Sequence, residues 1–428
     1  MALHRDGPAR RLEFTTRRAG EALLDLAAAA PDADWERPGH ESAVVSIGVD
    51  GRYVSDLVIP LATPTPRRLA LGRLDVGDHV LTARFAADRS PVGVCGARLD
   101  DLAVAVAAAG DPLHDALRHA PVLYGRTLPE LGTPFQNAIT DTPLLAWHET
   151  LPAAAGGHRV LEYSMVWSNE DDGTGTAALM ARWGRSTDIE WIYRVEVDAA
   201  GDRVASSAVY QGPDHRTLAF RGRYEGDHPL LETRTANNNV CDRVTGPMRF
   251  ALAADQTRPA GRARELLMDA NPWTYRVMAK ELVREGKVAP GASPLTPDVS
   301  DQRNYLYVEV VKDTAAPGGT GLAVGVRLRG DPTLYRSDHG VPSWSIERDL
   351  PAATTVELPA GTTADAVAEV VAIRQPIGQV DSGAAVTVRA VNRGFLLDDG
   401  YLPRASFLEW LGAVVLTRDR PQAPLIRR

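Results

Sequence analysis

The chain has little lysine and little cysteine, and each shortage excludes a kind of chemistry. Of its 47 basic residues only Lys280, Lys287 and Lys312 are lysines, so almost every cation is a permanently charged arginine. All three lysines lie away from the candidate site described below, and Schiff-base catalysis is set aside. The two cysteines, Cys95 and Cys241, exclude a disulfide-rich scaffold and a cysteine-only zinc site. Two buried thiols are the simplest interpretation.

The chain also lacks long apolar runs and clustered positive charge. No run approaches the roughly 18 residues of a membrane span, and the first 30 residues do not have the pattern of a secretory signal. We therefore expect a cytoplasmic protein without a membrane partner. With 55 acidic against 47 basic residues the net charge is −8, and the arginines are dispersed. Nucleic-acid binding, which needs clustered cations, is not expected.

Period-two hydrophobic patterning dominates the sequence and predicts strands. Val45, Ile47 and Val49 alternate with small or polar residues, and the following 50–51 dipeptide, Asp-Gly, predicts a hairpin turn. Residues 40–110 therefore indicate a small antiparallel β-sandwich. The preceding stretch 19–30 has helical propensity, and we expect a helix that packs on this sandwich.

The middle of the chain carries the strongest strand patterns, within 161–167 and 191–197. Five of the eight tryptophans fall between residues 147 and 273, where the densest core is expected. Between residues 262 and 286 the apolar spacing becomes helical, and Pro272 divides this segment into two predicted helices.

Strands resume after a linker rich in Pro, Gly and Ser at 290–298. Few helical patterns separate the strands, so a parallel α/β sheet is not expected. The predicted class is mainly β, with antiparallel β-sandwich domains and a short helical segment near 262–286. The predicted domains are an N-terminal β-sandwich module, a central β-sandwich with the helical segment and the candidate site, and a C-terminal β-rich region, at 1–112, 113–290 and 291–428.

Two carboxylates form the most informative polar pattern. Asp188 and Glu190 are two residues apart in a predicted strand, so they share one face with Cα atoms about 7 Å apart. Such a pair repels unless it binds a cation, shares a proton or meets an arginine. Arg182 and Arg185 are close in sequence. They either neutralise a structural face or bind a group of the substrate that carries or develops negative charge.

Histidines near predicted strand ends add to this pattern. His215 follows the strand after Glu190, His228 precedes the next strand, and His148 closes an earlier one. Histidine and carboxylate side chains suit acid–base catalysis or a divalent metal ion. The candidate ligands of such an ion are Asp188, Glu190, His215 and His228, and its presence stays open, since each histidine could equally be a structural hydrogen-bonding group.

Three segments carry a family resemblance over residues 119–245. They are HAPVLY at 119–124, TDIE at 187–190, and the pairs Asp-His at 214–215 and His-Pro at 228–229. Together they resemble the vacuolar protein sorting 62 family. Thr187 and Ile189 replace the glycine and tryptophan of that family's signature, and Asn238 stands where the family has a histidine. The resemblance implies a β-sandwich with a polar histidine–carboxylate cluster.

Three functions remain open. The first is an enzyme, a hydrolase or lyase, acting on a polar, carbohydrate-type substrate. Its catalytic residues would be Asp188, Glu190, His215 and His228, and its substrate-binding residues Arg182, Arg185, His148 and Asn238. The second is a non-catalytic β-sandwich protein that binds a ligand or a partner. The third is a structural or assembly protein that self-associates through open sheet edges. The expected partner is a small molecule or glycan, and the sequence does not define an oligomeric state.

Overall fold

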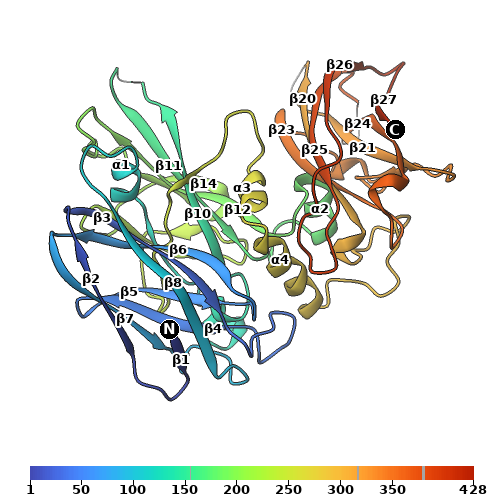
Figure 1. Ribbon diagram of the computed structural model, residues 1–428. Coiled ribbons are helices and arrows are strands. Elements are labelled where there is room, and N and C mark those ends of the chain that lie inside the picture. The colour runs from blue at the N-terminus through green and yellow to red at the C-terminus, as the bar shows by residue number, and fades with distance from the viewer. Residues whose placement is uncertain (155, 316–317, 378–380) are drawn as a thin grey trace. The chain divides into compact units, whose positions relative to one another are not determined.

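The computed structural model describes residues 1–154, 156–315, 318–377 and 381–428. It confirms a mainly β protein with several antiparallel sheets and few helices (Figure 1). The chain forms two compact units. The first comprises Met1–Asp172 and Thr187–Thr257, and the second comprises Gly173–Ser186 and Arg258–Arg428. Among the described residues, no helix combines the length and apolar character needed to cross a membrane.

The N-terminal part of the first unit is a sandwich of two four-stranded sheets, drawn in blue in Figure 1. One sheet has the order β1 (Ala2–His4), β8 (Gly96–Ala107), β3 (Gly20–Ala29) and β6 (Thr65–Leu74). The other has the order β2 (Arg10–Thr16), β7 (Gly77–Phe85), β4 (Ala43–Val49) and β5 (Arg52–Ile59). The predicted hairpin turn joins β4 to β5, with Asp50 at φ 52° and Gly51 at φ 79°.

The predicted helix at 19–30 is wrong, because these residues form the central strand β3. This strand pairs along its length with β6 on one side and β8 on the other. Leu24 and Ala28 are completely buried. The alanine-rich sequence favours a helix locally, but pairing on both edges satisfies most backbone groups of this strand and overrides that weak preference.

Two further sheets complete the first unit. A six-stranded sheet has the order β14 (Arg216–Ala219), β13 (Val209–Gly212), β12 (Asp188–Val197), β11 (Arg159–Trp167), β10 (Pro143–Pro152) and β19 (Gln256–Thr257). A smaller sheet has the order β15 (Tyr224–Glu225), β16 (His228–Thr233), β9 (Val122–Tyr124) and β18 (Arg249–Phe250), with β17 (Val240–Cys241) paired to β16. The short helix α1 (His114–Arg118) precedes β9.

Aromatic side chains pack between these two sheets. Tyr193 on β12 contacts Tyr163 and the edge of Phe220, with ring centroids 6.1 and 5.6 Å apart. Phe220 in turn meets the edge of Tyr224 on β15 at 5.0 Å. Edge-to-face pairs of this kind contribute about 0.5–1.5 kcal/mol beyond the burial of area. These aromatic contacts support the strand that carries Glu190, and Trp147 and Trp167 of the same region are completely buried.

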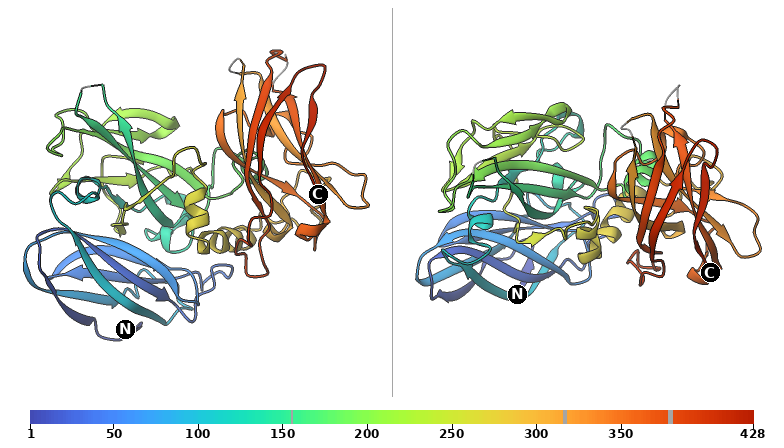
Figure 2. Two further views of the ribbon diagram at one scale, coloured as in Figure 1. Left: turned by 45° about the horizontal axis from the view of Figure 1, so that its top comes forward. Right: turned by 90° about the horizontal axis from the view of Figure 1, so that it is seen from above.

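The second unit contains a sandwich of two four-stranded sheets (Figure 2). One has the order β23 (Leu350–Glu357), β20 (Tyr305–Thr314), β25 (Val386–Phe395) and β26 (Trp410–Leu416). The other has the order β22 (Tyr335–Arg336), β21 (Thr320–Leu328), β24 (Val367–Pro376) and β27 (Gln422–Arg427). Alternate aliphatic residues of both sheets, such as Val308, Val324 and Val388, form one buried core.

Three helices accompany this sandwich. The two that the helical spacing predicts are α3 (Leu266–Ala270) and α4 (Trp273–Arg284), and Pro272 separates them as expected. Helix α2 (Thr176–Trp183) is absent from the sequence-based prediction. Thr354 and Thr355 on β23 donate hydrogen bonds to the carbonyls of Ala181 and Met180. The Thr354 hydroxyl thus bonds a carbonyl near the end of α2, and the Thr355 hydroxyl adds a second bond to the Met180 carbonyl, which also accepts from the backbone of Gly184.

The cysteines differ from the expected pair of buried thiols. Cys95 is exposed and Cys241 is half-buried, and both are free. Cys95 follows a turn at the sandwich surface. Its backbone N–H donates a hydrogen bond to the Asp32 carboxylate. Burial raises the pKa of the Cys241 thiol. A smaller fraction of it is therefore thiolate than in a solvent-exposed cysteine, and its reactivity is lower.

Candidate functional site

One carboxylate–histidine pair of the sequence analysis meets at the surface of the first unit. The side-chain amide of Gln211 lies between Glu190 and His215. Its Nε2 donates to Glu190 Oε2 at 2.6 Å and lies 3.0 Å from His215 Nδ1. The Glu190 Oε1 and His215 Nδ1 atoms are 3.7 Å apart. Because one amide nitrogen carries two hydrogens, it can serve both partners at once.

This geometry selects one tautomer of the neutral imidazole. If Gln211 donates to Nδ1 of His215, that nitrogen is an acceptor and the ring proton resides on Nε2. The His215 side chain is 54% exposed and that of Glu190 is 21% exposed, whereas Gln211 is buried. Glu190 therefore presents a carboxylate to solvent and His215 presents its Nε2–H, while the buried amide of Gln211 holds both side chains in place.

The position of His215 depends on an uncommon turn. Strands β13 and β14 are joined by a 3-10 turn, Pro213–His215, in which Asp214 and His215 both have left-handed backbones, with φ 59° and 55°. Non-glycine residues in this region cost on the order of 1 kcal/mol or more each and are enriched at functional sites. His215 follows Gln211 by four residues, and the turn between them brings its ring back toward β12.

A loop rich in asparagine completes the surroundings of His215. It joins β16 to β17, and Thr235 Oγ1 accepts a hydrogen bond from the backbone of Asn239. The Asn239 side-chain nitrogen lies 3.4 Å from His215 Nδ1, while Asn238 donates to the carbonyl of Asn169 at 3.2 Å. The buried Oδ1 atoms of Asn238 and Asn239 accept no hydrogen bond from any described residue. Buried amide oxygens in this state are uncommon, and they mark a site with unused hydrogen-bonding capacity.

Asp188 is placed differently from Glu190. It begins β12 opposite Trp167 of β11 and is only 2% exposed. Of the two carboxylates that share a strand, only Glu190 thus reaches solvent. This difference in exposure argues against a mechanism in which both carboxylates contact a substrate.

The two arginines expected beside this pair belong to the second unit. Arg185 forms a buried ion pair with Glu265 at 3.0 Å. Arg182 lies over the ring of Trp183, 4.2 Å from its centroid, and is 3.9 Å from Glu347. Both guanidinium groups have structural partners within that unit.

His228 lies in another environment, at the start of β16. Its Nδ1 is 2.9 Å from the carbonyl of Ala120, and its Nε2 is 3.3 Å from Glu21 Oε2 on β3. It lines a cavity of about 20 Å³, which has room for about one water molecule. The described contacts of His228 therefore do not join it to Glu190 and His215.

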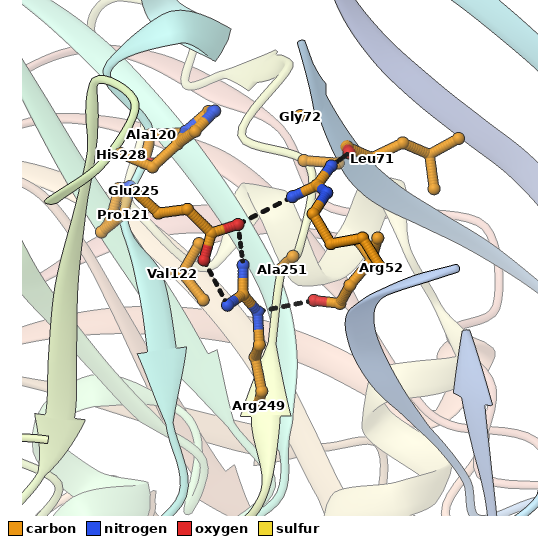
Figure 3. Close-up of a pocket in the computed structure, with 12 residues that line it drawn as sticks. Arg52, Leu71, Gly72, Ala120, Pro121, Val122, Glu225, His228, Arg249 and Ala251 are labelled. Carbon is orange, nitrogen blue, oxygen red and sulfur yellow. Dashed lines mark hydrogen bonds and ion pairs between the residues drawn. The ribbon is translucent and has the colours of Figure 1, made fainter. Parts of the chain in front are cut away.

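The same small cavity contains a charge network that the sequence did not indicate. Figure 3 shows the Glu225 carboxylate facing the guanidinium groups of Arg52 and Arg249. Arg249 contacts both Glu225 oxygens, at 2.6 and 2.9 Å, and Arg52 contacts one at 2.7 Å. Remaining donors bind the carbonyls of Leu71 and Val54. The network is internally satisfied and links the N-terminal sandwich to β15 and β18.

His148 also has a structural partner. Its Nδ1 lies 2.6 Å from the carbonyl of Ala254, and its side chain is buried. Burial lowers the pKa of His148, so the ring is neutral at pH 7. This hydrogen bond joins β10 to the segment before β19.

The described residues contain no group of three or more His, Cys, Asp or Glu side chains arranged to hold a metal ion. The four candidate ligands named above are not brought together. Glu190 and His215 form one pair, Asp188 is buried, and His228 contacts Glu21, which is not one of the four. Sequence reasoning missed Gln211 and Asn239, which hold His215. The available signal was a glutamine and an asparagine next to strand ends, residue types that are common in turns.

No protein-family model and no curated protein matches this sequence. Several solved structures share local similarity. One is the sugar-binding C-terminal domain of EclA, at 16% identity over 23% of this chain and 80% of that chain, with a TM-score of 0.17. Another is a family two carbohydrate esterase from Clostridium thermocellum, at 17% identity over 29% of this chain and 32% of that chain, also with a TM-score of 0.17. A Paenibacillus sp. cycloisomaltooligosaccharide glucanotransferase has 13% identity over 57% of this chain and 39% of that chain, with a TM-score of 0.18. Scores this low do not establish a common fold.

Proposed function

We propose that the protein is an enzyme, a hydrolase or lyase, in which Glu190 and His215 perform acid–base catalysis on a polar substrate. The observation that carries this proposal is the bridging position of Gln211 between the two side chains. A buried amide that donates to both groups fixes their separation and the tautomer of the imidazole. Groups held in this way are pre-organised for proton transfer.

The two groups would have complementary roles. Glu190, a partly exposed carboxylate, would accept a proton from a water molecule in a hydrolase or from a substrate carbon in a lyase. His215 would donate a hydrogen bond from Nε2–H, without losing the proton, to the oxygen on which negative charge develops, and the proton taken by Glu190 would pass to the departing oxygen. A neutral imidazole is able to polarise an oxygen in this way, since it need not be protonated first.

The surroundings support a polyhydroxylated substrate such as a carbohydrate. The partly exposed Glu190 carboxylate can accept hydrogen bonds from hydroxyls and the exposed His215 ring can donate to them, while the buried Gln211 and Asn239 side chains hold the pair in place. The resemblance to the vacuolar protein sorting 62 family also includes the segments that carry Glu190 and His215.

The test is turnover of the full chain on a panel of glycosides and polysaccharides, including substrates that contain uronic acids. Glu190→Gln and His215→Gln should each lower kcat by about 10²-fold or more, as expected for loss of an acid–base group, without loss of folding. The matched control is His158→Gln, because His158, just before β11, forms another histidine–glutamate pair with Glu196 of β12, at 2.7 Å and without a bridging amide. It should leave turnover unchanged.

Full turnover in both variants, or no turnover of any substrate, would remove the catalytic assignment. The alternative would then be a non-catalytic binding protein. A cavity in the second unit independently favours a binding role, and the two functions are compatible.

A further inference from the structure

The second unit contains a cavity of about 870 Å³ at one end of its sandwich. It is formed by three segments that are far apart in sequence: the turn just before β20, the loop between β23 and β24, and the loop between β25 and β26. The volume falls within the roughly 300–1,000 Å³ typical of small-molecule sites. All of its lining residues belong to this one unit.

The floor and the walls of this cavity differ in character. Leu396, Leu397 and Phe407 provide an apolar floor, and the two leucines are at most 5% exposed. Asn304 and Arg404 stand on the walls with acidic and hydroxyl side chains. An apolar surface bordered by convergent polar groups is the usual composition of a ligand site.

Several of the wall side chains are not used to hold the fold. Asp301 is tied to Arg303 through both carboxylate oxygens. By contrast, no described residue forms a side-chain hydrogen bond or ion pair with Asn304, Asp399 or Arg404. Their donors and acceptors are free to bind a molecule in the cavity.

The distribution of charge restricts the chemistry of that molecule. With the Asp301–Arg303 pair neutralised, the walls carry Asp365, Asp399 and Arg404. Two carboxylates against one guanidinium leave a charge of −1, which disfavours a phosphorylated ligand and is too small to favour a polycation. A sugar ring has an apolar C–H face and a rim of hydroxyls, which match the apolar floor and the amide, carboxylate and guanidinium groups of the walls.

We infer that this cavity binds an uncharged oligosaccharide, with Asn304, Asp399 and Arg404 bonding its hydroxyls and the apolar lining side chains contacting its C–H groups. The inference stands apart from the proposed enzyme, because it uses none of the residues around Glu190. Binding here would attach the protein to a glycan whether or not the first unit turns one over.

The experiment is titration calorimetry of the full chain with maltohexaose, cellohexaose, mannohexaose and xylohexaose. Inositol hexakisphosphate and an uncharged hexapeptide serve as comparison ligands. The variants are Asn304→Ala and Arg404→Ala, with unchanged thermal unfolding as the condition for comparison. The matched control is Arg420→Ala, an exposed arginine of the same unit that does not line the cavity.

The inference predicts that at least one of the four sugars binds, that each cavity variant weakens it at least tenfold, and that Arg420→Ala leaves affinity unchanged. Glu190→Gln should also leave it unchanged, which separates this result from the test of catalysis. Three outcomes would overturn the inference: none of the sugars binds, a bound sugar is insensitive to both cavity variants, or the phosphate or peptide binds more tightly.

Discussion

His228 Nε2 lies 3.3 Å from Glu21 Oε2, and both side chains are almost completely withdrawn from solvent. Burial lowers the pKa of His228, but the hydrogen bond and charge of Glu21, with the Ala120 carbonyl, outweigh burial. The pKa of His228 therefore lies above its ordinary value of 6.5. A histidine that gains a carboxylate on folding binds its proton more tightly in the folded state than in the unfolded one.

This pair predicts a pH-dependent stability. The contribution of His228 should be present in full below pH 6.5 and should be lost as pH rises through the higher pKa of the folded state. Urea unfolding of the full chain between pH 5.5 and 8.5 measures it. In His228→Gln the free energy of unfolding should fall less steeply across this range. An identical slope in wild type and variant would contradict the assignment.

Glu357 in the second unit should produce a second pH effect at lower pH. Burial raises the pKa of Glu357 from 4.5 to about 7, and hydrogen bonds from Tyr305 and Ser300 only partly oppose it. The stability that depends on protonated Glu357 should be complete below pH 4.5 and lost by about pH 7, by at most about 3 kcal/mol at 1.36 kcal/mol per unit. Unfolding between pH 4 and 8 tests this sign.

Glu357→Gln removes the titrating group with little change of shape. Its free energy of unfolding should vary less between pH 4.5 and 7 than that of the wild type. Asp365→Asn, an exposed carboxylate of the same unit, is the matched control and should leave the profile unchanged. A steeper profile for Glu357→Gln would mean that the carboxylate is ionised in the folded protein.

The buried pair Arg126–Asp141 should be among the costliest to break. Both side chains are completely buried, with Arg126 Nη1 2.6 Å from Asp141 Oδ2. Asp141→Asn would leave a buried guanidinium without one of its charge partners, for a loss of roughly 3–5 kcal/mol in free energy of unfolding. Asp100→Asn, which breaks the exposed pair with Arg98, should cost less than about 1 kcal/mol. Chemical denaturation of both variants measures the difference.

The strands were largely predictable because the alternation of buried and exposed side chains is a local property of the sequence. The two helices around Pro272 were predictable for the same reason. Strand β3 was not, since its alanines favour a helix and only pairing with β6 and β8 decides otherwise. Helix α2 was missed because its eight residues follow a glycine-rich acidic loop and depend on hydroxyls from β23.

The candidate site was predictable only where its residues are close in sequence. Glu190 and His215 lie on consecutive parts of one sheet, and the structure brings them together. His228 has an equally suggestive position in the sequence, but its partner Glu21 comes from a strand of the N-terminal sandwich. Long-range partners of this kind leave no local pattern. The same reason hid the burial of Asp141 beside Arg126.

Gln211 offers the sharpest test of the catalytic arrangement, because its proposed effect is on a proton and not on the fold. Its Nε2 lies 3.0 Å from His215 Nδ1, which keeps the ring proton of the neutral imidazole on Nε2. In Gln211→Met this donor is absent and only the longer contact from Asn239 Nδ2, at 3.4 Å, remains, so His215 Nδ1 should carry the proton or bond Glu190 Oε1 in part of the molecules. Nitrogen NMR of labelled histidine should therefore show nearly pure Nε2–H tautomer in the wild type and a mixture in the variant.

Turnover should follow the tautomer. Gln211→Met should lower kcat about tenfold or more with little change in KM, since a misplaced proton affects the transition state more than binding. Gln211→Asn keeps an amide but is one methylene shorter, and it should restore neither the tautomer nor the rate. If Gln211→Met has the wild-type tautomer and the wild-type kcat, the bridging amide only supports the turn, and Glu190 and His215 lose the feature that distinguishes them from the His158–Glu196 pair.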